Sequence, residues 1–354
     1  MATRNLWLPA PALALAFAVW MLWSVLVVRL PAAGFNYSTN QLFWLTALPA
    51  LCGATLRIFY AFAAPVLGGR RFRTLTTASL LLPAIGIGLA LQEPGTPYEF
   101  MVALALLCGL GGLGGLDGLD GLSGAQAGFA EQAAIFTRKH NWLMCWLVLG
   151  SLGSFIGFSA GLPLLMQSQF HRDETFEFAW PGPLIGALLW PLGRGLASRF
   201  GGGRVTFWAF VVMAVAAAVV LQCLPQAGPQ ANEGRFPGFL AGFGMLFAAA
   251  GIGNGSTLRM IPTLFLTAHQ RSAGPLPSAR TQAAKEGEVE AAAVLGFASA
   301  IGAYGGFFIP KSFGTSIAVS GSAAPALQLF IAFYLSCIAL TWWFYSRRNA
   351  PVPC

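Results

Sequence analysis

The chain has 354 residues, of which 56% are hydrophobic and only 9% charged, and its formal net charge is +8. Soluble domains carry roughly 25% charged residues, so this composition excludes a soluble protein and indicates an integral membrane protein. The positive charge is spread over the segments between apolar runs, which argues against a nucleic-acid-binding surface.

Ten apolar runs predict an all-α polytopic membrane protein with about ten transmembrane helices. A helix needs about 20 apolar residues to cross the bilayer, and the strands of a membrane barrel would instead alternate with period two. The first run is too long for the core of a signal peptide, so we expect it to be retained as a helix. The runs are Leu6–Leu30, Leu42–Leu67, Leu75–Leu91, Tyr98–Leu116, Trp142–Met166, Phe178–Leu196, Val205–Leu224, Phe236–Leu266, Ala291–Pro310 and Ala326–Tyr345.

The charges between the runs predict the orientation. If the N-terminus is cytoplasmic, the even-numbered connections and the C-terminal tail are cytoplasmic too, and they hold most of the basic residues. These are Arg70, Arg71, Arg73, Arg138, Lys139, Arg199, Arg204, Arg271, Arg280, Lys285, Arg347 and Arg348. Both termini are therefore predicted to be cytoplasmic.

A short pattern recurs 133 residues along the chain. Gly53–Arg57, followed by Leu67–Arg71, is similar to Gly186–Trp190, followed by Phe200–Arg204. Both copies lie on runs that head inward and end in a short basic segment. Chance similarity among glycine-rich membrane segments is the alternative, but the matching position and direction favour a duplicated half.

The two halves are unequal, because four runs precede Trp142 and six begin at or after it. The glycine-rich stretch Gly109–Gly124 lies between them and has no helical pattern. A six-plus-six protein that lost one helical hairpin would look like this, since removing a pair of helices preserves the direction of everything after it. We predict an incomplete N-terminal half (1–116), a glycine-rich and basic cytoplasmic linker (117–140), and a six-helix C-terminal half (141–354).

Arg57 is the most informative ionisable residue within the runs. Its guanidinium stays charged and offers a planar fork of donors that suits a small planar oxyanion. The alternative is a structural arginine paired with a carboxylate or a helix end. Arg194 lies near the inner end of its run, where snorkelling to the interface is favoured. For Arg259 and its glycine-rich neighbours, helix packing is favoured over lining a substrate path.

Catalysis is poorly supported by the sequence. His140, His171 and His269 fall between runs or at their ends, where a lone histidine is usually solvated. No nucleophile–base pair, metal-ligand spacing or phosphate-binding loop is visible. We therefore expect neither an enzyme nor a bound metal or cofactor.

Several motifs resemble the nitrate/nitrite porter (NarK-type) family of the major facilitator superfamily. They are Gly53–Tyr60, Gly68–Arg71, His140–Met144, Gly153–Gly161, Gly253–Thr257 and Ala291–Gly296. The resemblance covers nearly the whole chain outside 110–126. It implies a bacterial-type inner-membrane protein with two six-helix halves and alternating access to a central nitrate or nitrite.

The resemblance also implies a substrate site. Arg57 matches the arginine that binds the anion in this family, and Phe17 matches a phenylalanine that packs on it. Gly296–Phe307 matches the second nitrate signature, in which Ser299 is expected to face the anion. Trp190 stands where the family has its second arginine, with Arg194 one turn below it.

Other parts of the family pattern are missing. Val148 and Leu152 stand in place of an aromatic pair. The first nitrate signature belongs to the fifth helix, and that hairpin is absent here. We therefore expect a secondary transporter of nitrate and nitrite in the lipid bilayer, with anion exchange favoured over proton coupling because intramembrane carboxylates are few. The alternative is a transport-incompetent remnant or an accessory membrane subunit of the same family.

Overall fold

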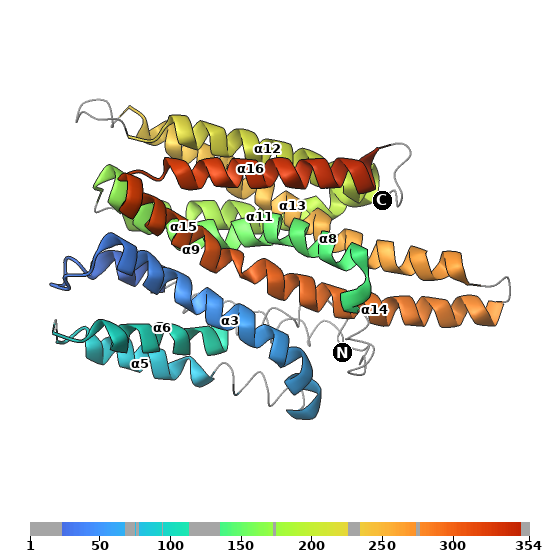
Figure 1. Ribbon diagram of the computed structural model, residues 1–354, viewed down its shortest axis with the longest axis horizontal. Coiled ribbons are helices and arrows are strands. Elements are labelled where there is room, and N and C mark those ends of the chain that lie inside the picture. The colour runs from blue at the N-terminus through green and yellow to red at the C-terminus, as the bar shows by residue number, and fades with distance from the viewer. Residues whose placement is uncertain are drawn as a thin grey trace. The chain divides into compact units, whose positions relative to one another are not determined.

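The structure is a computed structural model that describes residues 23–67, 75, 78–93, 95–112, 135–172, 175–225, 234–273 and 277–347. Within those ranges the chain is helical and contains no strand (Figure 1). The helices are α3 (Thr39–Leu67), α5 (Leu81–Ala90), α6 (Tyr98–Gly112), η2 (Ile135–Thr137), α8 (Lys139–Val148), η3 (Leu149–Gly153), α9 (Ser154–Phe170), α10 (Thr175–Ala179), α11 (Pro181–Phe200), α12 (Gly202–Gln222), α13 (Phe236–Ser272), α14 (Pro277–Ala303), α15 (Gly305–Ser320), α16 (Ala324–Thr341) and η5 (Trp342–Ser346). The all-α polytopic class is confirmed.

Nine of the ten predicted runs overlap these helices. Of the first run, residues 23–30 are described, and 23–29 of them are helical. Among the described residues, six helical segments are long and apolar enough to cross a membrane. They are Thr39–Phe59, Lys139–Phe170, Gly202–Gln222, Phe236–Arg271, Pro277–Ser320 and Ala324–Ser346. Leu81–Ala90 and Tyr98–Leu110 are shorter apolar helices.

The connection between the eighth and ninth runs differs from the prediction. We expected a charged loop, but α13 continues to Ser272 and α14 begins at Pro277. The physical reason is that residues 277–293 include six alanines and three glutamates, which are strong helix formers. Two helices therefore extend past the apolar segments that reach across the membrane.

The chain forms two compact units, which we describe separately. Unit 1 comprises Met1–Gly121, Ile156–Trp180 and Ala303–Ala326. Its helix α3 packs against α6 and α15, and α5 packs against α6. The interior is aromatic: Phe43 and Phe158 both contact the ring of Phe313. The indole of Trp23 is buried and donates a 2.6 Å hydrogen bond to the carbonyl oxygen of Leu45.

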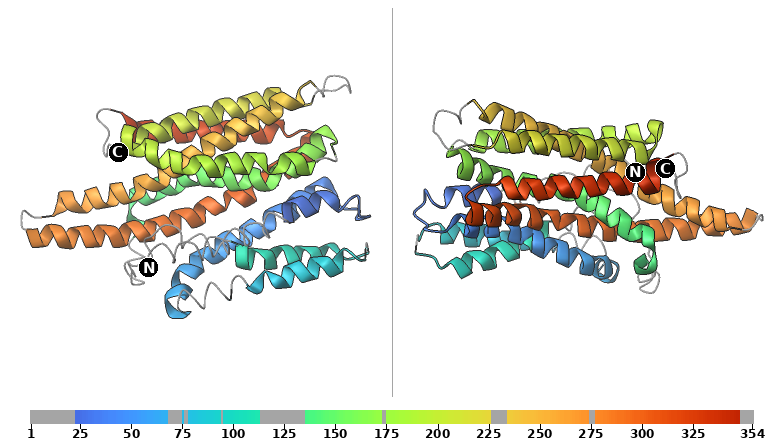
Figure 2. Two further views of the ribbon diagram at one scale, coloured as in Figure 1. Left: turned by 180° about the vertical axis from the view of Figure 1, so that it is seen from behind. Right: turned by 45° about the horizontal axis from the view of Figure 1, so that its top comes forward.

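Unit 2 comprises Leu122–Phe155, Pro181–Gly302 and Leu327–Cys354. Helices α11, α12 and α13 pack against one another and run side by side in Figures 1 and 2. Hydroxyl groups link them, because Thr206 on α12 lies 2.9 Å from Ser256 on α13. These two units follow contacts, whereas the predicted halves follow the repeat, so the predicted division stays a prediction.

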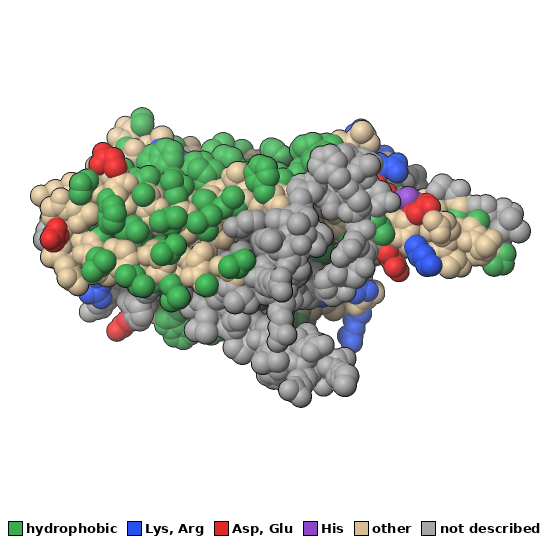
Figure 3. Space-filling model, turned by 90° about the horizontal axis from the view of Figure 1, so that it is seen from below, with side chains coloured by type: hydrophobic (Ala, Val, Ile, Leu, Met, Phe, Trp, Pro, Cys, Tyr) green, Lys and Arg blue, Asp and Glu red, His purple; other side chains and the backbone are tan. Residues whose placement is uncertain are grey.

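Most charged side chains of the described residues lie near the ends of the helices, and Arg57, Arg259 and Lys311 are exceptions that lie inside them. On the face drawn in Figure 3, hydrophobic side chains are spread over much of the surface that is not grey, and the lysine, arginine, aspartate and glutamate side chains that can be seen lie toward its two ends. This distribution fits helices whose centres lie in hydrocarbon and whose ends reach the aqueous phases.

Candidate functional site

Arg57 is a buried cation on α3 in unit 1. Arg57 is only 5% exposed, although arginine is rarely buried in proteins. Two residues before it, the hydroxyl of Thr55 lies 2.9 Å from that of Tyr304, so α3 is tied to the start of α15 at this level. A buried arginine within a membrane-spanning helix is a candidate for binding an anion.

The first copy of the repeat is also where α3 meets another helix. A Cβ atom built on Gly109 of α6 would lie 2.6 Å from the Cβ of Cys52 and 2.9 Å from the backbone nitrogen of Gly53. Only a glycine at position 109 allows this approach. In unit 1 the second and fourth helices therefore meet at the glycine that opens the repeat.

The second copy of the repeat makes the same kind of contact in unit 2. A Cβ atom on Gly251 of α13 would clash with the carbonyl oxygen of Gly186 on α11. A Cβ atom on Gly255 would lie equally close to the carbonyl oxygen of Trp190, and one on Gly193 would lie equally close to that of Ile252. The prediction that this glycine-rich part of α13 serves helix packing is confirmed, and Arg259 is exposed.

Trp190 and Arg194 lie together on α11, as their spacing of one helical turn requires. The guanidinium carbon of Arg194 is 5.6 Å from the centre of the Trp190 ring, within cation–π range. The indole nitrogen of Trp190 is buried and has no hydrogen-bond partner among the described residues. Arg194 itself is exposed, in line with the predicted snorkelling.

Helix α14 has one open position and one tightly packed position. A Cβ atom on Gly296 would meet nothing within 4 Å, whereas one on Gly302 would lie 2.9 Å from Val148 and 3.1 Å from Leu152. Ser299, between them, is buried. The glycines of this helix therefore differ in role: Gly302 packs against Val148 and Leu152, and Gly296 borders open space.

Of the predicted site residues, Arg57 belongs to unit 1, and Trp190, Arg194, Gly296 and Ser299 belong to unit 2. Phe17 lies outside the described residues. The structure brings Trp190 and Arg194 together. The convergence of Arg57 with the residues of unit 2 stays a prediction.

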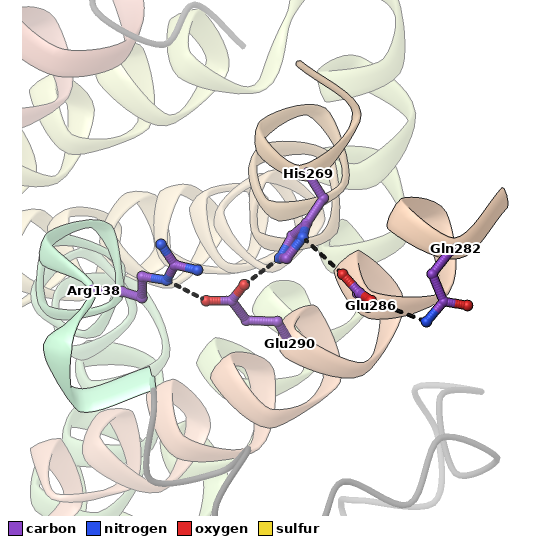
Figure 4. Close-up of polar contacts among 5 residues, drawn as sticks. All are labelled: Arg138, His269, Gln282, Glu286 and Glu290. Atoms are coloured by element: carbon purple, nitrogen blue, oxygen red, sulfur yellow. Dashed lines mark hydrogen bonds and ion pairs between the residues drawn. The ribbon is translucent and has the colours of Figure 1, made fainter. Parts of the chain in front are cut away.

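A polar cluster at the extended helix ends was missed by the sequence reasoning (Figure 4). Glu290 accepts a 2.9 Å hydrogen bond from Nε of Arg138 and lies 2.5 Å from Nε2 of His269. Glu286 lies 4.0 Å from Nδ1 of His269 and accepts a 2.9 Å bond from Gln282. The expectation that His269 is simply solvated is wrong. The i, i+4 spacing of Gln282, Glu286 and Glu290 on a helix was the signal that could have revealed this cluster.

The chain is similar to curated nitrate/nitrite transporters over almost its whole length. It is 36% identical to the nitrate/nitrite transporter NarU of Escherichia coli (strain K12) across 98% of this chain and 92% of that protein. The chain belongs to the nitrate/nitrite porter family. It is also 31% identical to the probable nitrate/nitrite antiporter NarK2 of Thermus thermophilus, across 100% of this chain and 95% of that protein. The curated relatives of this family are named as transporters, so the protein is not an enzyme.

Other comparisons add little. No family model matches the chain. Among solved structures, it is similar to the human organic anion transporter MFSD10 with 14% identity and a TM-score of 0.42, over 95% of this chain and 84% of that one. A likeness at this level is too low to bear on the fold.

The porter relatives are longer within the matched region. The alignment with NarU spans 431 positions, whereas this chain has 354 residues in total, so at least 77 positions hold a residue of NarU and none of this chain. Because the match covers 98% of the chain, most of this difference is internal. It is large enough to include a helical hairpin.

Proposed function

We propose that this protein is a secondary transporter that exchanges nitrate and nitrite by alternating access. The observation that carries the proposal is Arg57, a buried cation on a membrane-spanning helix, within a motif that resembles the nitrate/nitrite porters. NarU and NarK2 are named for the transport of these two anions.

The chemistry of Arg57 suits this substrate. Nitrate and nitrite are small planar anions, and a guanidinium can donate two parallel hydrogen bonds to two of their oxygens. The bond is charge-assisted and lies in a low-dielectric interior, where it is stronger than in water. The bound anion shifts the equilibrium between inward-open and outward-open states only through its different affinity for each.

The other predicted residues complete the site in this proposal. Ser299 offers a hydroxyl donor, and Gly296 leaves room beside it for the anion to pass. Phe17 packs on the face of the anion. Arg194, stacked on Trp190, supplies a second cation one turn from the position where the family has an arginine.

Exchange is favoured over proton coupling because the described acidic residues avoid the middle of the membrane-spanning segments. Glu99 and Glu177 lie in the first turns of their helices, and Glu286, Glu288 and Glu290 lie on the extended part of α14. No carboxylate in the described parts of the chain is thus placed to carry a proton past the anion. The membrane in this proposal is a bacterial-type inner membrane, with both termini cytoplasmic.

A second candidate is supported by the shorter chain. The residues that NarU has and this chain lacks could include part of the wall around the anion, which would leave a transport-incompetent remnant or an accessory subunit.

Counterflow in proteoliposomes separates the two candidates. Vesicles loaded with nitrite should accumulate isotopically labelled nitrate from outside, and vesicles loaded with chloride should not. At a low nitrate concentration, Arg57→Lys should lower the accumulation about ten- to a hundredfold, while Arg280→Lys, a change at an exposed arginine on α14, should leave it intact. Equal nitrate levels in nitrite-loaded and chloride-loaded vesicles would reject exchange, and levels no higher than in protein-free vesicles would reject transport and favour the second candidate.

A further inference from the structure

A groove with a volume of about 510 Å³ lies among α11, α12 and α13 of unit 2. Helix α12 contributes a continuous stripe at positions 204, 205, 208, 209 and 212. Ala209 and Ala249 are buried and form part of its floor, and the exposed side chains of Trp208 and Met245 lie beside them. Every lining residue except Arg204 is apolar.

The groove exists because of the close helix packing described above. Gly193 lets α11 approach Ile252 of α13. A Cβ atom built on Gly253 of α13 would lie 3.3 Å from the Cβ of Ala209 on α12. The helices are thus held together at small residues, and the alanine side chains between them leave a hollow that no larger side chain fills.

One end of the groove is basic. Arg204 lines it in the first turn of α12, and Arg199 is exposed in the last turn of α11. Neither side chain forms a hydrogen bond or ion pair with another described residue. The first backbone N–H groups of α12, which begins at Gly202, also lie at this end and favour an anion.

The dimensions fit a hydrocarbon chain better than a helix. The stripe from Arg204 to Val212 is about 12 Å long at 1.5 Å per residue, so 510 Å³ corresponds to a cross-section of about 40 Å². A helix about 10 Å across needs roughly twice that area. A second protein helix would therefore rest on the groove rather than enter it.

We propose that this groove binds one acyl chain of an anionic phospholipid, whose phosphate pairs with Arg204 and Arg199. The forked guanidinium groups match phosphate oxygens, and a basic pocket between membrane helices on the cytoplasmic side is suited to an anionic headgroup. A zwitterionic choline lipid would place its own cation near two arginines, so it binds more weakly. The proposal is independent of nitrate transport, since none of these residues belongs to the proposed anion site.

Native mass spectrometry of the full chain in detergent tests the proposal with dioleoyl phosphatidylglycerol and dioleoyl phosphatidylcholine as probes. The wild type should retain one phosphatidylglycerol and bind phosphatidylcholine about tenfold more weakly. Arg204→Gln should lower phosphatidylglycerol affinity about tenfold, since it removes one charge-assisted contact. Arg280→Gln, which removes the same charge at an exposed position outside the groove, should not.

A second pair of variants tests the hollow itself. Ala248→Phe fills the groove from a half-buried lining position, and Ala241→Phe adds the same side chain at an exposed position of α13 outside it. Only Ala248→Phe should lose the retained lipid. Equal lipid retention in both variants, equal affinity for the two lipids, or loss of a protein dimer instead of lipid in Ala248→Phe would overturn the proposal.

Discussion

At the scale of single residues, the buried charge of Arg57 should act through its geometry as well as its sign. Arg57→Lys keeps the charge but replaces a planar fork with a point charge, so one of two parallel bonds to the anion is lost. Hydrogen bonds to charged groups contribute about 1.5–3 kcal/mol, so nitrate affinity should fall roughly ten- to a hundredfold. Isothermal titration in detergent measures this. Unchanged affinity in a well-folded Arg57→Lys protein would remove Arg57 from the site.

A change at Trp190 tests whether a second guanidinium strengthens nitrate binding. Trp190→Arg places a guanidinium at the position where the resemblance predicts the family's second arginine, and it should strengthen nitrate binding by a similar factor. The side chain is half-buried beside Gly255, so an arginine of comparable length fits without displacing α13. Titration of the single variant and of the Trp190→Arg, Arg57→Lys double variant would show whether the gain needs Arg57. No gain in either would mean that position 190 does not reach the anion.

At the scale of helices, glycine positions separate packing from open space. Gly251→Ala places a methyl group against the carbonyl oxygen of Gly186, and overpacking of this kind costs about 1–3 kcal/mol. Gly244→Ala, on the same helix, meets nothing within 4 Å and should stabilise α13 by up to about 1 kcal/mol. The midpoint temperature of thermal unfolding in detergent should therefore fall for Gly251→Ala and rise for Gly244→Ala. Shifts of the same sign would contradict the close contact between α11 and α13.

The cluster around Glu290 gives a second test at this scale. Glu290→Gln removes the negative charge that faces both Arg138 and His269, and these link three helical elements of unit 2 (Figure 4). The Arg138 side chain is 57% exposed, so screening by water limits its share, and a total loss of about 1 kcal/mol is expected. Amide hydrogen exchange should become faster over 266–272 at the end of α13. The exposed Glu288→Gln is the matched control, and equal exchange in both variants would mean that the cluster does not hold these ends together.

The helices could be predicted from the sequence because the length of an apolar run depends only on consecutive residues. The runs around Val205–Leu224 and Ala326–Tyr345 match α12 and α16 closely for this reason. The cluster of Glu290 with Arg138 and His269 could not, since it depends on α14 continuing as a helix where charge suggested a loop. The different roles of Gly296 and Gly302 also needed the structure, because both occur in the same small-residue pattern and only their neighbours differ.

At the scale of the whole molecule, the repeat indicates which helices the chain lacks. Gly109 of α6 contacts the first copy of the repeat as Gly251 of α13 contacts the second, so α6 and α13 occupy equivalent places in their halves. The helix α13 is the fourth in its half, after α8–α9, α11 and α12. We propose that the four predicted runs before the central segment correspond to helices one to four, and that helices five and six are the pair without a counterpart in this chain. This inference accounts for the unequal halves without reversing the direction of any later helix.

Helices five and six can be the missing pair only if α6 crosses the membrane. The described helix Tyr98–Gly112 has 15 residues and spans about 22 Å, less than the roughly 30 Å of hydrocarbon. If α6 crosses, single cysteines at Gly95 and Gly234 should react with a membrane-impermeant maleimide in intact cells. Cysteines at Ser198 and Arg271 should react only after permeabilisation. The six native cysteines would first be replaced by serine. Labelling of Gly95→Cys and Gly234→Cys from opposite sides would show that the number of crossings between these two positions is odd, whereas the predicted number is even. The missing segment would then not be a hairpin.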